Sequence, residues 1–89
     1  MQAPLCFIGV DVSKAELVMA THGLDSCLSV PNASAAIVQW LHTLPPGALL
    51  AMESTGRFHQ LLANLAATMG LVVFVLNARD VYFYAKGLG

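Results

Sequence analysis

Two short, continuous apolar runs constrain the fold of this 89-residue chain more than any other feature. They occupy residues 48–52 and 71–76, and turn-forming residues bound both of them. Runs of this length without alternation are typical of strands buried on both faces, as in parallel sheets. An amphipathic helix is predicted between them, closed by Gly70 at its C-terminus. Its apolar face comprises Phe58, Leu61, Leu62, Leu65 and Met69. The pattern therefore predicts a strand–helix–strand unit.

The N-terminal third has the different pattern of an antiparallel meander. Strands are predicted over residues 5–11, 15–22 and 25–30, with tight turns between them. A helix follows, with Asn32 as its predicted N-cap. Its apolar positions recur at three- and four-residue spacing, at Ala33, Ala36, Ile37, Trp40, Leu41 and Leu44. The sequence therefore predicts one α/β domain, in which three antiparallel strands precede parallel strands and helices pack on a mixed sheet.

A last helical segment is predicted after the final strand. Asn77 is its predicted cap. Its apolar stripe comprises Val81, Tyr84, Ala85 and Leu88.

The composition points to apolar surface that needs a partner. Hydrophobic residues make up 57% of the chain and charged residues only 10%, against a usual charged share of about 25%. Such a chain has more apolar surface than a domain of this size buries. We therefore expect it to pair with a second copy, as a homo-oligomer, or with chain beyond these residues.

Export and membrane insertion are not predicted. Residues 1–4 lack the basic start of a signal peptide, and the apolar stretch over residues 61–76 changes its period at Gly70. We therefore expect a cytoplasmic protein without a membrane segment. The net charge of −1 gives no overall basic footprint for nucleic acid, so any contact with nucleic acid must be local.

Two acids stand at the ends of strands that would be central. Asp11 follows the apolar "FIGV", and Glu53 follows "ALLAM". Parallel neighbouring strands would set the two carboxylates side by side, where they repel unless a cation lies between them. Carboxylate oxygens are ligands that Mg²⁺ or Mn²⁺ prefers. A metal site at Asp11 and Glu53 is one interpretation, and ordinary turn or cap residues are the other.

Candidate phosphate contacts lie beside both acids. Lys14 is on the first hairpin turn, and Thr55, Gly56 and Arg57 lie at the predicted start of the second helix. Helix N-termini attract phosphate through their free N–H groups, although capping alone also explains a hydroxyl there. Arg79 and Lys86 are further candidate contacts for nucleic-acid phosphate, with solvated surface as the alternative.

The segments "IGVDVSKAELVMA" and "MESTGRFHQLLANLAATMGLVVFVLNARDVYFYAKGLG" resemble a known family. They are similar to the N-terminal domain of bacterial DEDD transposases of the insertion-sequence-110 family, which includes the Piv-type invertases. The resemblance covers residues 5–89 and implies an RNase H-like (RuvC-like) fold. It also implies that Asp11 and Glu53 are the first two catalytic acids of a four-acid site for Mg²⁺ or Mn²⁺.

The resemblance further implies an enzyme that cuts and rejoins DNA as an oligomer, in several members under the direction of a guide (bridge) RNA. In the family the other two acids follow the position of "AKGLG", beyond Gly89. We therefore expect residues 1–89 to be a single incomplete catalytic domain that is inactive alone. One departure is Asn77-Ala78, where many members read Asn-Pro.

Two other classes compete with this interpretation. The first is half of a kinase-like ATPase of the same fold. The phosphate-binding hairpin of that class requires a glycine after the first acid. The sequence "DVSK" has none, which disfavours that class. The second is a non-catalytic dimerisation module, which the apolar composition favours.

Overall fold

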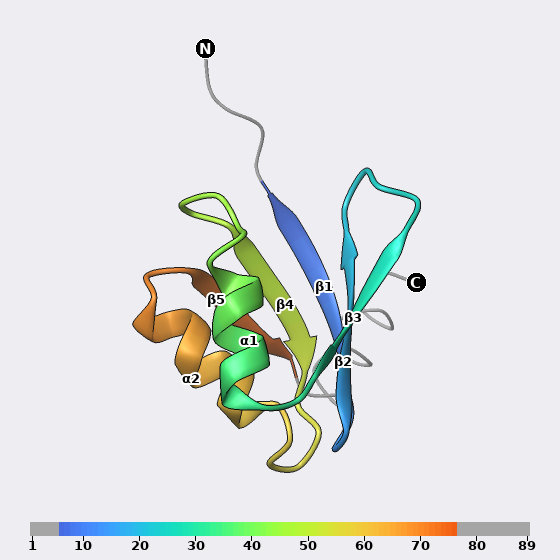
Figure 1. Cartoon of the computed structure of the whole chain (residues 1–89), viewed down its shortest axis with the longest axis vertical. Helices are drawn as coiled ribbons and strands as arrows, with labels where there is room; N and C mark the ends of the chain where they lie inside the picture. The colour runs from blue at the N-terminus through green and yellow to red at the C-terminus, as the bar shows by residue number, and fades with distance from the viewer. Residues whose placement is uncertain (1–5, 77–89) are drawn as a thin grey trace, which may run out of the picture.

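The computed structural model describes residues 6–76, which form one five-stranded mixed sheet with two helices (Figure 1). The elements in chain order are β1 (Phe7–Val12), β2 (Glu16–Thr21), β3 (Cys27–Pro31), α1 (Ser34–Leu41), β4 (Leu49–Glu53), α2 (Gln60–Thr68) and β5 (Val72–Leu76). This confirms the predicted α/β class and element order as far as Leu76. The helical segment predicted from Asn77 lies outside the described residues.

The strand order across the sheet is β3-β2-β1-β4-β5. The first three strands form an antiparallel meander, as predicted, because tight turns join them. β1 and β4 then pair in parallel, as do β4 and β5. Each parallel pair needs a crossover connection, and α1 and α2 supply these connections.

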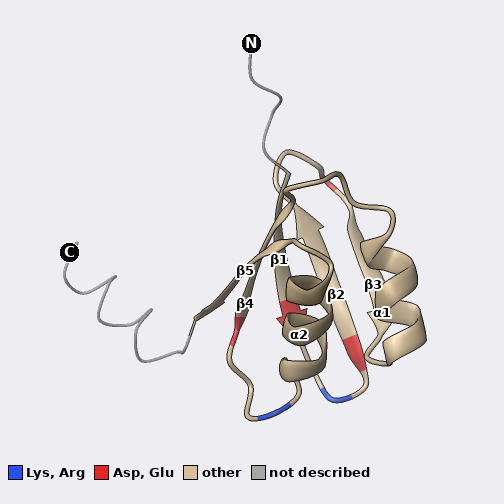
Figure 2. Cartoon of the chain, turned by 90° about the vertical axis from the view of Figure 1, so that its left-hand side faces the viewer, with Lys and Arg blue, Asp and Glu red and all other residues tan. Residues whose placement is uncertain are grey.

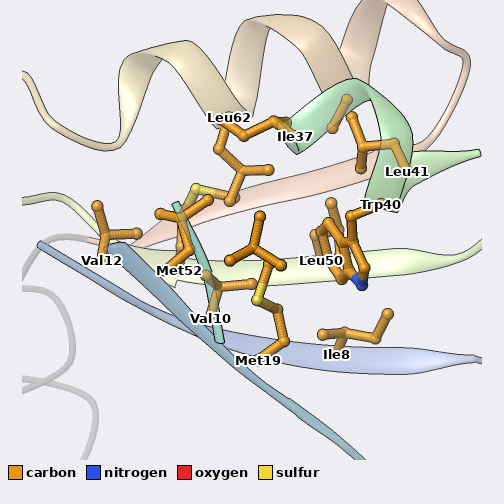
Figure 3. Close-up of a cluster of buried hydrophobic side chains, with 13 residues drawn as sticks. Ile8, Val10, Val12, Met19, Ile37, Trp40, Leu41, Leu50, Met52 and Leu62 are labelled. Carbon is orange, nitrogen blue, oxygen red and sulfur yellow. The ribbon is translucent and has the colours of Figure 1, made fainter. Parts of the chain in front are cut away.

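Both helices lie on the same face of the sheet (Figure 1). Alternate residues of the strands point toward them and form the core with residues of the helices (Figure 3). Its largest fully buried side chains are Ile8, Leu17, Ile37, Leu41, Leu50 and Leu62. The three-residue spacing from Ile37 to Trp40 puts both side chains on the buried side of α1, as the sequence predicts.

The opposite face of the sheet carries no helix among the described residues. The prediction that residues 71–76 are buried on both faces is therefore wrong here. In β5 the side chains of Phe74 and Leu76 are exposed, and only Val73 is half-buried. An unbroken apolar run predicts a strand but does not say how many of its faces are covered.

The ends of the helices differ from the predictions in two places. α1 begins after Ala33, and no side chain caps its first turn, so Asn32 is not its N-cap. α2 begins at Gln60, after a series of turns that includes Phe58. Its C-terminus is as predicted, with Gly70 at a φ of 82°.

The chain reverses after α2 by a Schellman arrangement. The N–H of Gly70 donates to the carbonyl of Ala67 at 3.0 Å, and that of Leu71 donates to Ala66 at 3.1 Å. The left-handed backbone at Gly70 favours a residue without a side chain. No helix within residues 6–76 has the length and apolar character needed to span a membrane.

Replacing Leu50 by alanine is expected to lower the free energy of unfolding by about 2–5 kcal/mol, because it opens a cavity in the centre of the core. Leu24→Ala is the matched control, since Leu24 is 65% exposed on the β2–β3 turn and should change stability by about 0.5 kcal/mol or less. Denaturant unfolding of both variants measures the difference. Equal losses would contradict the placement of Leu50 at the centre of the core.

Candidate functional site

The carboxylates of Asp11 and Glu53 lie beside each other at one end of the sheet. β1 and β4 are parallel, and Val10 pairs with Met52, so the next residue of each strand is one of the two acids. Both side chains are exposed, on the face opposite α1 and α2. Adjacent strands are about 4.8 Å apart, so the two carboxyl groups project from neighbouring positions.

The two acids line an open hollow of about 250 Å³. Its other lining residues are Gly9, Val10, Ala51, Met52 and Leu76. The surface is hollowed there because Gly9 and Ala51, two small residues, are paired neighbours in the sheet. Glu53 pairs with Leu76 on the other side, so the hollow is apolar apart from the two carboxylates.

The donor chemistry of the pair fits a hard divalent cation. Mg²⁺ is commonly held by one or two carboxylates, with water and substrate phosphate as the other ligands. Two exposed carboxylates that face an open hollow offer that arrangement. Within residues 6–76, no third histidine, cysteine or acid joins them in a metal-binding cluster. The described residues thus bring two carboxylates, those of Asp11 and Glu53, to one hollow, and these are the two groups there that could hold a Mg²⁺ or Mn²⁺ ion.

Lys14 lies on the β1–β2 turn, three residues after Asp11. Ser13 holds this turn in shape. Its backbone N–H donates to the carbonyl of Glu16 at 3.0 Å, its hydroxyl donates to the same carbonyl at 2.8 Å, and the N–H of Glu16 donates back to that hydroxyl. Lys14 is therefore carried at the exposed tip of a well-bonded hairpin.

Arg57 lies on the turns between β4 and α2. Gly56 has a φ of 60°, which favours glycine at that position. The Phe58 N–H donates to the Thr55 carbonyl at 3.1 Å, so this segment folds as a tight turn ahead of the helix. The prediction of a helix N-terminus at Thr55 and Gly56 is wrong in position, because α2 begins only at Gln60.

The side chain of Thr55 is turned away from solvent. Its hydroxyl oxygen is buried and has no hydrogen-bond partner among residues 6–76, while its backbone N–H donates to Nδ1 of His59 at 3.2 Å. A contact between this hydroxyl and a phosphate would require the turn to open. His59, which was not predicted as a functional residue, instead fixes the turn that carries Arg57.

Asn32 ties the two turns together. Its side-chain nitrogen donates to the carbonyl of Ser13 at 2.9 Å and to that of Phe58 at 3.0 Å. Both carbonyls therefore lie within reach of one atom, and the β1–β2 turn is held beside the β4–α2 turn. Lys14 directly follows Ser13, and Arg57 directly precedes Phe58. The amide of Asn32 therefore connects both cationic turns, which lie at the same end of the sheet as the acids (Figure 2).

The predicted site residues thus divide into three groups. Asp11, Glu53, Lys14 and Arg57 share one end of the sheet and are exposed, as is Gly56. Thr55 shares that end with a buried hydroxyl. The predicted phosphate contacts at Arg79 and Lys86 lie outside the described residues.

Sequence reasoning missed the role of Asn32 because its place before a helix is explained equally well by capping. Only the fold shows that its amide is used between two distant turns. No spacing in the sequence connects Asn32 with Ser13 or Phe58.

No model of a known protein family matches this chain, and no curated protein matches it.

Asn32→Ala is expected to lower the free energy of unfolding by about 1–3 kcal/mol, because two carbonyls lose a shared donor in a partly buried place. Asn32→Asp should cost at least as much, since it puts a carboxylate against those carbonyls. Asn64→Ala, at an exposed position of α2, is the control and should be neutral or slightly stabilising. The proposed tie fails if both asparagines respond alike in denaturant unfolding.

Asp11→Asn is expected to stabilise the protein by about 0.2–1 kcal/mol in a chelator-treated buffer, because it relieves repulsion between neighbouring like charges. The measurement is the unfolding midpoint at low ionic strength, and the gain should shrink in high salt. Asp25→Asn, on the exposed β2–β3 turn at the other end of β1, serves as control. A gain of the same size there would argue against a special Asp11–Glu53 repulsion.

Proposed function

We propose that this chain is the metal-binding part of an RNase H-like catalytic domain in a DNA transposase or site-specific recombinase that cuts and rejoins DNA. The observation that carries the proposal is the placement of Asp11 and Glu53 at adjacent ends of parallel strands, around one open hollow. The resemblance of the segments around both acids to the DEDD transposases gives the reaction class. A mixed sheet of three antiparallel strands followed by parallel ones is the architecture that this resemblance implies.

The proposed roles follow from position and charge. Asp11 and Glu53 hold a Mg²⁺ or Mn²⁺ ion, which when bound activates the nucleophile and stabilises the leaving oxygen of a phosphodiester. Lys14 and Arg57, on turns held together by Asn32, bind the DNA backbone on either side of the acids. Phosphate contacts of this kind position DNA without reading its sequence.

The proposal also includes the cellular compartment, the oligomeric state and the nucleic-acid partner of the enzyme. They are action in the bacterial cytoplasm, assembly as a homo-oligomer and direction by a guide (bridge) RNA. The guide RNA comes from the family resemblance alone, whereas the apolar composition also favours the homo-oligomer.

A non-catalytic dimerisation module is the second candidate. The observation in its favour is the sheet face that no helix of residues 6–76 covers, on which Phe7 and Phe74 are exposed. Exposed apolar surface of this kind commonly marks an interaction site. It does not, however, account for two acids side by side on the same face, since unneutralised like charges oppose the burial that a dimer interface requires.

Metal binding provides the first test. Titration of Mn²⁺ into the isotope-labelled protein should broaden amide signals around Asp11, Glu53 and Leu76, and Mg²⁺ should raise the melting temperature, because an ion that binds only the folded state stabilises it. Asp11→Asn and Glu53→Gln should each weaken Mn²⁺ binding about tenfold or more. Asp25→Asn should bind Mn²⁺ like the wild type. Broadening centred elsewhere, or unchanged in both site variants, would contradict the proposed metal ligands.

The reaction itself provides the second test. The intact gene product is incubated with Mg²⁺ and a plasmid that carries its gene and flanking DNA, and new DNA junctions are mapped by sequencing. We expect junctions with the wild type and with Asp25→Asn, and a loss of about 100-fold or more with Asp11→Asn or Glu53→Gln. Junctions that form equally well without both carboxylates would overturn the proposed function.

A further inference from the structure

The lysine and arginine side chains of the described chain are gathered at one end of the sheet. Lys14 and Arg57 are the only residues of these two types among residues 6–76, and both are exposed. They lie on two turns that are far apart in the sequence, at the end that carries the acids (Figure 2). Within residues 6–76, this end is therefore where a polyanion would meet permanent positive charge.

One side chain keeps the two cationic turns adjacent. The Nδ2 atom of Asn32 donates to the carbonyl of Ser13 at 2.9 Å and to that of Phe58 at 3.0 Å. The two carbonyl oxygens are therefore separated by no more than the sum of these distances. Because Lys14 follows Ser13 and Arg57 precedes Phe58, the two cations project from neighbouring parts of the surface.

The β1–β2 turn is also fixed from within, by the bonds between Ser13 and Glu16. The carboxylate of Glu16 accepts a hydrogen bond from the hydroxyl of Ser29 at 2.9 Å, so one of its oxygens is used on β3 rather than beside Lys14. The position of Lys14 relative to Arg57 is thus set before any ligand binds, which lowers the entropic cost of binding.

Two cations held together repel each other unless negative charge lies nearby. Asp11 and Glu53 supply some of that charge, but a divalent ion held by the two acids would offset it. Phosphates of nucleic acid then become the complementary anions, since one DNA strand carries a negative charge about every 3.4 Å along its axis. Lysine and arginine bind phosphate through charge-assisted hydrogen bonds.

We propose that Lys14 and Arg57 act as one unit that binds neighbouring phosphates of a single DNA strand, and that Asn32 is the positioning residue of this unit. The inference rests on the proposed function, which assigns both cations to the DNA backbone. It adds that each cation depends on the other and on the amide that ties their turns. Because phosphate contacts read no sequence, the unit sets the register of one strand relative to the acids.

A double-mutant cycle tests the unit. The full 89-residue protein is titrated into a fluorescent single-stranded DNA oligonucleotide in Mg²⁺, and anisotropy gives the Kd. We expect Lys14→Gln and Arg57→Gln each to weaken binding about tenfold, and the double variant to lose much less than the product of the two effects. The salt dependence of Kd should fall by similar amounts in all three variants. Strictly multiplicative effects, or no binding by the wild type, would overturn the proposal.

Charge relocation separates the position of the cation from the overall charge. Lys14→Gln combined with Leu24→Lys keeps the net charge but moves the cation to the β2–β3 turn at the opposite end, where Leu24 is 65% exposed. We expect this variant to bind as weakly as Lys14→Gln alone, and Lys14→Arg to bind within about threefold of the wild type. Recovery of binding in the relocated variant would overturn the proposal.

Asn32→Ala tests the positioning role. We expect it to weaken DNA binding about threefold or more and to make the effects of Lys14→Gln and Arg57→Gln multiplicative, because the two turns are no longer tied. Ile37→Val, which loosens the core without touching either turn, should preserve both the affinity and the coupling. Coupling that persists in Asn32→Ala, or that is lost equally in Ile37→Val, would contradict the role of Asn32.

The metal site is tested separately in the same variants. Mn²⁺ broadening should stay centred on Asp11 and Glu53 in Lys14→Gln and Arg57→Gln. Normal broadening with multiplicative effects of the two cation variants would overturn the unit and leave the proposed metal ligands standing. Coupled DNA binding without broadening at the acids would support the unit and contradict the metal site.

Discussion

The parallel pairing of β1 with β4 is the constraint on which the rest of the molecule depends. It joins the N-terminal meander to the C-terminal strand–helix–strand unit, and both segments contribute side chains to the one core. Because the strands run in the same direction, their C-terminal ends reach the same edge of the sheet. Asp11 and Glu53 are neighbours for that reason, although 42 positions separate them in the sequence.

The same pairing sets the difference between the two faces of the sheet. Both crossover helices follow the rule that parallel connections have one handedness, and in this order of strands they cover one face. Alternation then sends Ile8, Val10 and Val12 into the core and leaves Phe7, Gly9 and Asp11 on the other side. The acid pair and exposed apolar side chains such as Phe7 and Phe74 therefore share one face, where the carboxylates keep contact with water.

Much of the fold could be predicted from local pattern. Tight turns, alternation and helical spacing predict each strand and both helices to within a few residues, and Gly70 predicts the end of α2 because its backbone angle suits few other residues. The predictions that failed depended on tertiary context. The apolar run of β5 predicts a strand but not the exposure of Phe74, which depends on where the helices pack.

In the candidate site, too, some features could be predicted from the sequence, whereas others depend on contacts between segments that are distant in the sequence. The position of Asp11 beside Glu53 followed from reasoning about parallel strands, because strand direction is encoded in the order of elements. The helix start expected at Thr55 was misplaced, since a hydroxyl followed by glycine suits a tight turn as well as a cap. The amide of Asn32 could not be assigned to Ser13 and Phe58, because those partners become neighbours only in the folded sheet.

The tie formed by Asn32 has a consequence for how this fold tolerates changes in loop length. A single inserted residue in the β1–β2 turn or in the β4–α2 turn would carry one carbonyl beyond the reach of the Asn32 nitrogen, so the lengths of these two loops are coupled to each other. The β2–β3 turn at the opposite end is exposed from His22 to Ser26. That turn is therefore where the fold can accept an inserted peptide, a fusion partner or a natural extension without disturbing the end that carries the acids.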